Sequence, residues 1–518
     1  MKRILIIYLS ALLFSACSDS FLDVPPQSTS TEGNFYKTES HFTQAINNAY
    51  SSLRDLYNDR GFAMTEMRSD NTHYTFYSEA RGYHSTDKED IANFTVAIEN
   101  TNVRDMWKYC YSSIAKANTI LGRLEGKTFS EEFTNKTMGQ AKFIRAFAYF
   151  RLVQFFGGVP LQLTEVTNSE NNELARSSVD DVYTQIIADV KDAIAKLEPV
   201  TFPASGFADG AATQGAAKML YAYALMTKPT RDYAEAEKQL SDILKMGYEL
   251  ETEFADVFEP AKKNGKEHIF SIQYQQGDQG QQSKWLYIMM PRTNNGDVIT
   301  GIAGTKTVED AGWNVPTDVM VNMFADDDKR RNVSVGIAVS NNTEESNMLK
   351  KVENWYFAKD PEIDNYAVAI PFIRKYHHAH TKLNNTDDNW PVYRYADALL
   401  LLAECLVAQG KAGEAAQYLN RVRTRAGLKE FTGTVTADVV AAERKLELAF
   451  ENHRWFDLLR TGKALEVMTE HGKYIKEKFG NEIPTNSYNI KEGYLVYPIP
   501  YLEMQRNKLL TQNEGYVN

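Results

Sequence analysis

The amino-acid sequence predicts a fold dominated by α-helices, in which a scaffold of helix pairs supports a loop-rich, partly β insertion. Three observations lead to this prediction. Apolar residues recur at helical spacing over much of the chain, two segments share the pattern of a helix pair, and the helical spacing fades between residues 247 and 392. The part where it fades is where we expect the insertion.

The chain opens with the pattern of a lipoprotein signal. A basic start precedes an apolar run from Ile4 to Phe14, and Ser15-Ala16-Cys17 follows. A secretory signal needs such a start, about 7 to 15 apolar residues and small residues before the cleavage site. The run is too short for a transmembrane helix, which takes roughly 20 residues. We predict a signal peptide over residues 1–16, lipidation of Cys17, and a tether over residues 17–40.

The composition behind the signal is that of a globular protein. Of 518 residues, 43% are hydrophobic and 24% are charged, and no second long apolar run occurs. The net charge of -11 argues against nucleic acid or an anionic membrane surface as ligand, because both require a basic face. With Cys17 lipidated, Cys110 and Cys405 remain in apolar, helix-like surroundings. We therefore predict buried thiols and no stabilising disulfide.

Amphipathic helices are expected through residues 41–246, the N-terminal part of a body that spans residues 41–518. Helical spacing of apolar and small residues is clear from Ala45 to Leu56, and again from Trp107 to Leu121. Further helices are predicted at residues 138–156, 179–197, 211–226 and 233–246. Their close succession is typical of a helical scaffold.

Two segments have the pattern of helix pairs of the tetratricopeptide kind. Residues 395–428 combine an apolar helix, a turn at Gly410 and a second helix rich in alanine. Residues 217–244 repeat this arrangement around a break at Lys228 and Pro229. Small residues let the helices of a pair approach closely, and neighbouring pairs stack to bury a shared face. Because the repeats are degenerate and unevenly spaced, they favour a supporting scaffold over an open solenoid.

Binding residues are expected in two irregular blocks, because loops held on a rigid frame commonly carry them. The larger block, residues 247–392, is rich in Gly, Asn, Gln and aromatic residues and contains strand-like runs such as residues 268–273. The smaller block, residues 70–90, interrupts the N-terminal helices with tyrosines and histidines. Residues 393–518 are expected to form a C-terminal helical part and a tail.

Five motifs occur in an order that chance would rarely produce. They are Phe21-Leu22-Asp23-Val24-Pro25-Pro26 behind Cys17, residues 141–161 with Ala141-Lys142-Phe143-Ile144-Arg145 and Phe156-Gly157-Gly158-Val159-Pro160, residues 393–397, residues 443–458 and residues 497–516. With these motifs the chain resembles the SusD/RagB family of nutrient-binding outer-membrane lipoproteins over nearly its full length.

The resemblance implies a lipoprotein that faces outward from the outer membrane, with about four helix pairs of the tetratricopeptide-like kind and a loop-rich ligand face. It also implies a partner, a SusC-type TonB-dependent transporter barrel, which the protein covers like a lid. The predicted function is capture of an oligo- or polysaccharide and its transfer to that transporter. A peptide-binding lid of the same uptake complex is the alternative, and a surface glycosidase is a third interpretation.

The chemistry of sugars selects the candidate ligand residues. A pyranose has an apolar face that stacks on an indole or phenol ring, and hydroxyls that pair with planar polar side chains. The candidates in the two irregular blocks are Asn71, Tyr74, Tyr77, Trp285, Tyr287, Arg292, Asn294 and Trp313. Each of these aromatic residues could instead pack in the core of its loop.

Several motif residues fit the scaffold better than the ligand. The motif residues Arg145, Glu447, Arg454, Trp455 and Asp457 fall on predicted helices. A buried arginine and carboxylate pair would join neighbouring elements there. Trp107 also belongs to the scaffold, because it falls on the apolar stripe of a helix.

Catalytic and metal-binding signals are weak. Residues 122–128 are similar to a phosphate-binding loop, but the spacing between their two glycines is one residue too short. They also follow a predicted helix, whereas such a loop follows a strand. The acidic run at residues 326–328 lacks the Gly and Glu of a calcium-binding loop. His378 and His380 would share one face of a strand, but the sequence offers no third metal ligand. We predict a binding protein without enzyme activity, cofactor or metal.

Overall fold

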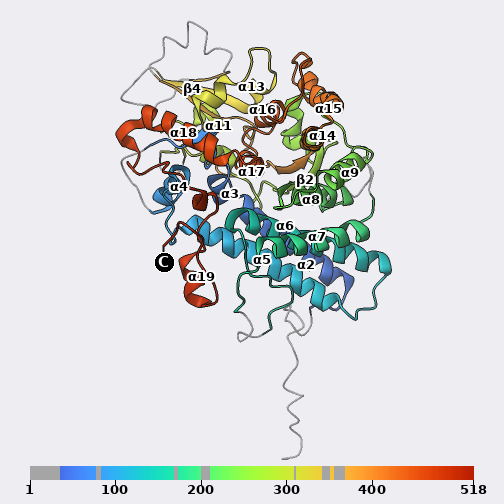
Figure 1. Cartoon of the computed structure of the whole chain (residues 1–518). Coiled ribbons are helices and arrows are strands. Elements are labelled where there is room, and N and C mark those ends of the chain that lie inside the picture. Colours follow the sequence, from blue (N-terminus) through green and yellow to red (C-terminus); the bar gives the residue numbers. More distant parts are fainter. Residues whose placement is uncertain are drawn as a thin grey trace, which may run out of the picture.

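The computed structural model describes residues 35–76, 83–167, 173–199, 210–308, 311–340, 351–354 and 368–517 (Figure 1). Cys17, the tether up to residue 34 and the candidate Tyr77 lie outside the described residues. Among the helices that are described, we find none with the length and apolar character needed to span a bilayer.

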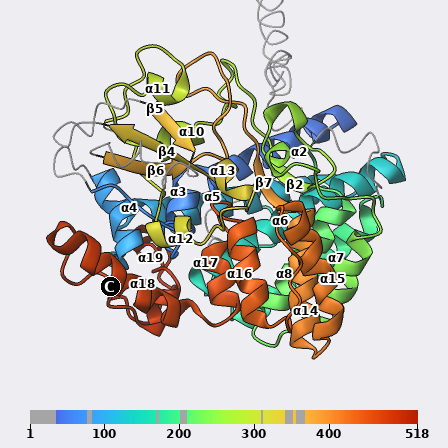
Figure 2. The same ribbon diagram turned by 90° about the horizontal axis from the view of Figure 1, so that it is seen from above.

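A layer of stacked helices forms the scaffold. Its members are α2 (Glu39–Leu53), α5 (Thr101–Leu124), α6 (Glu131–Phe156), α7 (Val179–Lys196), α8 (Gln214–Thr227), α9 (Tyr233–Ile243), α14 (Tyr395–Ala408), α15 (Ala412–Arg425) and α16 (Ala437–Glu447). Each helix from α5 to α9 packs against the next, and α9 packs against α14 (Figures 1 and 2). The two predicted helix pairs, α8 with α9 and α14 with α15, are therefore neighbours in space, and the predicted helical-repeat scaffold is confirmed.

Local sequence signals set the helix boundaries. Helices α6, α7 and α8 begin after Ser130, Ser178 and Thr213, whose side-chain oxygens accept a backbone N–H of the first turn. Gly157 ends α6 with a positive φ of 71°, a backbone conformation that glycine adopts without a steric penalty. From Ala141 onward α6 is buried on nearly all sides. Its continuous run of apolar and small residues suits a helix at the centre of a layer.

Short strands and helices make up most of the remainder. The strands are β1 (Thr72–His73), β2 (His268–Ile272), β3 (Val315–Pro316), β4 (Val335–Ser340), β5 (Lys351–Asn354), β6 (Val368–Ile373) and β7 (Trp390–Arg394). They pair antiparallel as β1 with β3, β2 with β7, and β4 between β5 and β6. The described strands of the larger irregular block thus include the strand-like run at residues 268–273.

The other described helices lie outside the scaffold layer. They are η2 (Arg54–Tyr57), α3 (Asp59–Met64), α4 (Tyr83–Asn93), η5 (Phe254–Val257), η6 (Pro260–Lys262), α10 (Trp285–Met289), α11 (Asp297–Thr300), α12 (Asp318–Asn322), α13 (Arg330–Ser334), α17 (Arg454–Arg460), α18 (Ala464–Phe479), η8 (Gly480–Glu482), η9 (Glu492–Leu495) and α19 (Tyr501–Arg506). Figure 2 shows α4 and α10 beside the β4–β6 sheet, whereas α2 lies with β2, β7 and α6.

Buried ion pairs join elements that are distant in sequence. The charged motif residues pair as Arg145 with Asp189, Glu447 with Arg394, Arg454 with Asp70, and Asp457 with Arg444. Trp455 is fully buried. The pair of Arg454 with Asp70, 2.7 Å apart, ties α17 to the smaller irregular block. These contacts confirm that the motif residues belong to the scaffold.

Two buried histidines make the fold sensitive to acid. The His73 ring stacks on the rings of Tyr74 and Phe479, with centroids 4.3 and 5.0 Å away. His471 on α18 packs edge-on against Tyr488. Burial disfavours the charged imidazolium, and it lowers the pKa of His73 to about 3 and that of His471 to about 4.

The protein is expected to lose stability as the pH falls from about 6.5 towards 4. In this window the unfolded chain binds protons at His73 and His471, whose unfolded pKa is about 6.5, whereas the folded chain does not. The loss should reach about 2 kcal/mol per histidine near pH 4.5. We expect unfolding curves of a His471→Gln variant to depend less on pH than those of the wild type. An equal pH dependence of the two proteins would contradict this prediction.

Candidate functional site

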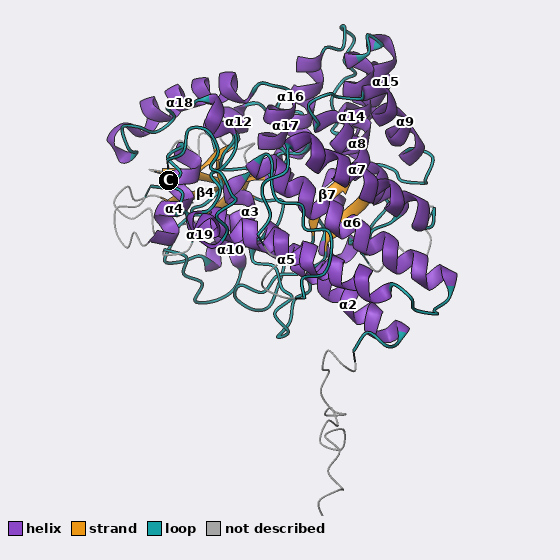
Figure 3. Ribbon diagram, turned by 60° about the horizontal axis from the view of Figure 1, so that its bottom comes forward, coloured by secondary structure: helices purple, strands orange, loops and turns teal. Residues whose placement is uncertain are grey.

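The two irregular blocks meet at the paired strands β1 and β3. Thr72 lies opposite Pro316, and His73 lies opposite Val315. Beyond the strands, the backbone N–H of Thr75 donates to the carbonyl of Gly312 at 2.8 Å. We call residues 71–76, 285–308 and 311–316 the loop junction. Figure 3 shows its loops gathered around α10, apart from the helix layer of α6 to α8.

Trp313 forms the centre of the loop junction. Its side chain is only 3% exposed, and its ring lies 6.0 Å from the ring of Tyr74. The Lys88 ammonium lies 4.9 Å from the indole centroid, and the Arg292 guanidinium carbon lies 5.9 Å from it. Lys88 also pairs with Asp59 at 3.0 Å. The indole therefore serves as a packing surface for two cations of the protein itself.

Trp285 and Tyr287 are packed into the interior on α10. Trp285 is 2% exposed, and its ring meets those of Tyr274 and Trp390 edge-on at 5.2 and 5.0 Å. The Tyr287 hydroxyl lies 2.6 Å from Nε2 of His380. Both rings are in the core, so neither offers a free face on which a sugar ring could stack.

Tyr74 and Asn71 are also occupied within the fold. The Tyr74 hydroxyl accepts a hydrogen bond from Asn93 at 2.8 Å, and the ring is 2% exposed. The Asn71 amide donates to Glu66 at 2.7 Å and is fully buried. The placement of Asn71, Tyr74, Trp285, Tyr287 and Trp313 corrects the expectation that they face a ligand. Pairing of the two blocks brings Tyr74 against Trp313. Trp285 and Tyr287 are covered by residues of the larger block itself, as the alternative of a loop core anticipated.

Two predicted ligand residues remain at the surface of the loop junction. Asn294 is exposed, and Arg292 is half-buried, with its guanidinium donating to the carbonyl of Val308 at 2.9 Å. The sequence did not single out Lys88, which the fold adds to this cluster. Its position on α4 follows no motif, and only its contact with Trp313 reveals it.

The histidines considered as metal ligands have separate protein partners. Nδ1 of His378 lies 2.5 Å from a carboxylate oxygen of Asp388, whereas His380 lies against Tyr287. Within the described ranges, no group of three or more histidine, cysteine or acidic side chains is arranged to hold a metal ion.

A helical-repeat scaffold that carries a loop-rich insertion defines the structural class. Residues 266–516 match the family model described as "SusD family", and residues 20–220 match the model described as "Starch-binding associating with outer membrane". Together these matches take in most of the chain. The chain belongs to the SusD/RagB family.

Individual relatives cover nearly the whole chain. SusD-like protein P2 of Formosa agariphila is 28% identical over all of both chains. The starch-binding protein SusD of Bacteroides thetaiotaomicron is 26% identical over 83% of this chain and 82% of its own length.

Solved structures share the fold. A laminarin binding SusD-like protein superposes with a TM-score of 0.74, at 24% identity over 93% of this chain and all of that chain. Surface glycan-binding protein A from Bacteroides thetaiotaomicron, in complex with laminarihexaose, gives a TM-score of 0.69 at 23% identity, covering 92% of this chain and 99% of that chain.

Proposed function

We propose that the protein is a cell-surface lipoprotein that captures an oligo- or polysaccharide and passes it to a SusC-type TonB-dependent transporter barrel. The observation that carries the proposal is membership of the SusD/RagB family over nearly the full length of the chain. Relatives in this family are named for starch binding, and a structural neighbour is named for laminarin binding. The protein holds its ligand without chemical turnover.

The ligand face in this proposal is the open edge of the loop junction. Asn294 supplies an amide, and Arg292 supplies a planar guanidinium, the side-chain types that pair well with sugar hydroxyls. Tyr77 lies outside the described residues and stays a prediction for the stacking ring. Trp313 does not contact the ligand in this proposal. Its contact with Arg292 holds the Arg292 side chain in position.

Outward orientation and membrane attachment complete the proposal. The lipid on Cys17 holds the protein at the outer membrane, and the tether that precedes α2 lets the body cover the transporter. The acidic net charge of -11 keeps the body from binding an anionic lipid surface directly.

Replacing both Arg292 and Asn294 by Ala is expected to weaken glycan binding by about tenfold or more, because two hydrogen bonds to the sugar are lost. Titration calorimetry of the purified protein against a panel of polysaccharides, oligosaccharides and peptide digests measures this effect. Product analysis of each mixture accompanies the titrations. Gln417→Ala, which removes an exposed amide from α15, is the matched control and should bind like the wild type.

Binding to peptides alone would move the protein to the peptide-binding branch of the family. Released sugar products would overturn the proposal that the protein is not an enzyme. Glycan binding that the Arg292 and Asn294 double variant leaves unchanged would place the ligand away from the loop junction.

A further inference from the structure

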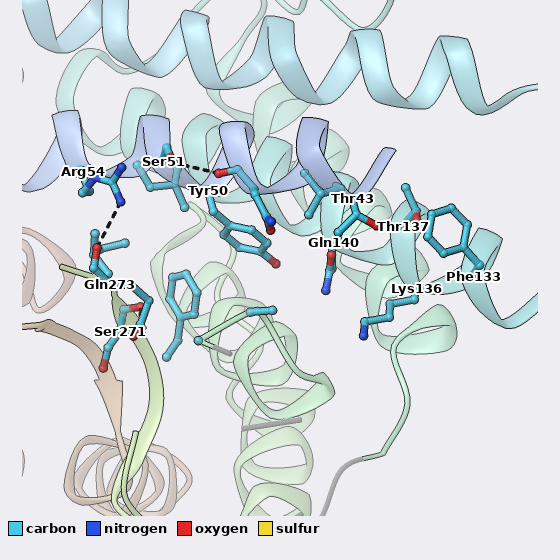
Figure 4. A pocket seen from close by; sticks show the side chains of 17 residues that line it. Thr43, Tyr50, Ser51, Arg54, Phe133, Lys136, Thr137, Gln140, Ser271 and Gln273 are labelled. Atoms are coloured by element: carbon cyan, nitrogen blue, oxygen red, sulfur yellow. Dashed lines mark hydrogen bonds between the residues drawn. The ribbon is translucent and has the colours of Figure 1, made fainter. Parts of the chain in front are cut away.

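A second cavity lies on the helical scaffold, away from the loop junction. It has a volume of about 570 Å³ and is enclosed by α2, α6, β2 and the residues before α8 (Figure 4). This volume is typical of small-molecule sites. None of the residues that line it belongs to the loop junction. We call this space the scaffold cavity.

The scaffold cavity is cationic although the whole chain is acidic. Arg54 and Lys136 line it, and the described residues of its lining include no Asp or Glu. In Figure 4, Arg54 lies at one end and Lys136 at the other. Arg54 makes one long hydrogen bond of 3.4 Å to the carbonyl of Gln273. Two cations with no carboxylate among the described lining residues favour an anionic ligand, because opposite charges attract each other more strongly in a partly desolvated site than in water.

Gln140 is a hydrogen-bonding group that the fold leaves unused. Its side chain is 6% exposed and points into the cavity between the two cations (Figure 4). Its amide makes no hydrogen bond to another described residue, and it is not one of the fully buried polar groups, so it reaches the open space of the cavity. An amide in this position can donate to and accept from a polar ligand or water. Gln140 therefore points to an occupant with polar atoms.

Tyr50 adds an aromatic surface and a hydroxyl donor. Its ring lines the cavity from α2, and its hydroxyl accepts a hydrogen bond from the backbone N–H of Ala212 at 2.9 Å. This bond fixes the ring and leaves the hydroxyl proton free to be donated. Burial raises the pKa of Tyr50 above its ordinary value, so the hydroxyl stays protonated. A fixed ring beside an amide suits the apolar face and the hydroxyls of a sugar.

We propose that the scaffold cavity binds an acidic saccharide unit, one that carries a carboxylate or a sulfate group. Lys136 and Arg54, at opposite ends of the cavity, would each pair with an anionic group of the saccharide. Gln140 and the Tyr50 hydroxyl would bind sugar oxygens, and the Tyr50 ring would pack on the pyranose. The proposal rests on the proposed function in that it assumes a saccharide ligand, and it adds a second site and a charge preference. An acidic peptide is less suitable, because the unused groups are spaced around one compact cavity and do not follow an extended groove.

Titration calorimetry with trigalacturonate and with its methyl ester tests the proposal on the purified full-length chain in detergent. The ester carries a methyl group in place of each negative charge, so the acid is expected to bind about tenfold more tightly than the ester. A sulfated galactan trisaccharide beside its desulfated form distinguishes sulfate from carboxylate as the preferred anion. Added salt should weaken binding of the acid, since Lys136 is exposed.

The decisive variant is Lys136→Glu, which reverses a charge at the cavity on an exposed residue and so leaves folding undisturbed. It should abolish binding of the acidic sugar, whereas Lys136→Arg should keep it. Lys238→Glu makes the same charge change at an exposed position on α9 and should have no effect. Gln140→Leu, of similar size, should weaken binding of acid and ester alike.

Equal binding of acid and ester would overturn the proposal, as would binding that Lys136→Glu leaves unchanged. Preferential binding of an acidic tripeptide that Lys136→Glu abolishes would also overturn it. Binding of neutral glycans at the loop junction should not respond to any of the cavity variants. The experiments therefore distinguish a failure of the proposal for the scaffold cavity from a failure of the proposed glycan-binding function.

Discussion

Replacing Glu447 by Gln is expected to lower the free energy of unfolding by about 3–5 kcal/mol. The Glu447 carboxylate is fully buried, pairs with Arg394 at 2.5 Å and Arg330 at 3.1 Å, and also contacts Arg425. If Glu447 loses its charge, the guanidinium groups of these three buried arginines each lose a negatively charged partner. Removing one member of a buried ion-pair network lowers stability by more than the intact ion pair adds to it. The reason is that the remaining charges stay buried without a partner.

Chemical unfolding of the Glu447→Gln variant at neutral pH measures the loss. The matched control is Glu466→Gln, since Glu466 makes only an exposed pair with Lys463 and should cost no more than about 0.5 kcal/mol. Similar unfolding midpoints for the two variants would contradict the role of Glu447.

The Glu447 carboxylate also makes the free energy of unfolding depend on pH, and the direction of this dependence can be predicted. The neighbouring arginines hold the pKa of Glu447 well below its ordinary value, against the opposing effect of burial. Because the folded pKa is depressed, the contribution is fully present above the unfolded pKa of about 4.3 and is lost as the pH falls below it. The Glu447→Gln variant should therefore lose less stability than the wild type on acidification below pH 4.

The helical scaffold could be predicted because its signals are local. Helix periodicity, the small residues of α8 and α14, and the turn at Gly410 each lie within one short segment. The stacking of α9 against α14 joins helices more than a hundred residues apart, yet the repeat pattern anticipates it. A repeat unit cannot bury its apolar face alone, so neighbouring pairs must meet.

The ligand residues were harder to predict because residue type does not reveal which way a loop side chain points. Trp285 and Trp313 stand among Gly and Asn, as a sugar platform would. Trp285 is buried because Trp390, more than a hundred residues further along the chain, packs against it. Trp313 is buried against Tyr74 only because β1 pairs with β3, between segments about 240 residues apart. No periodicity encodes this pairing, because each strand has only two residues.

The scaffold cavity left no signal in the sequence for a related reason. Tyr50 and Gln140 lie on helices whose apolar stripes predict ordinary packing, and Arg54 resembles any surface arginine. That the described residues around them include no acidic side chain emerges only when α2, α6 and β2 come together. Polar residues on the inner face of a predicted helix, such as Gln140, are the one feature that could have pointed there.

Removing Cys17 is expected to release the protein almost completely from the membrane. A Cys17→Ser chain, exported behind a conventional cleavable signal, keeps the body but has no thiol to carry lipid. Each buried acyl methylene contributes about 0.8 kcal/mol, so two or three chains hold a protein stably and none leaves it free. Among the described helices, none could replace the anchor by spanning the bilayer. Cell fractionation and incorporation of labelled fatty acid measure the effect.

Ser18→Ala is the matched control for the Cys17 variant, because it changes the neighbouring residue and keeps the thiol. It should remain in the membrane fraction with a full complement of label. A Cys17→Ser protein that still sediments with membranes after a high-salt wash would show attachment through the body itself. Given the acidic body, such attachment would have to come from a protein partner, and the transporter barrel would be the first to remove genetically.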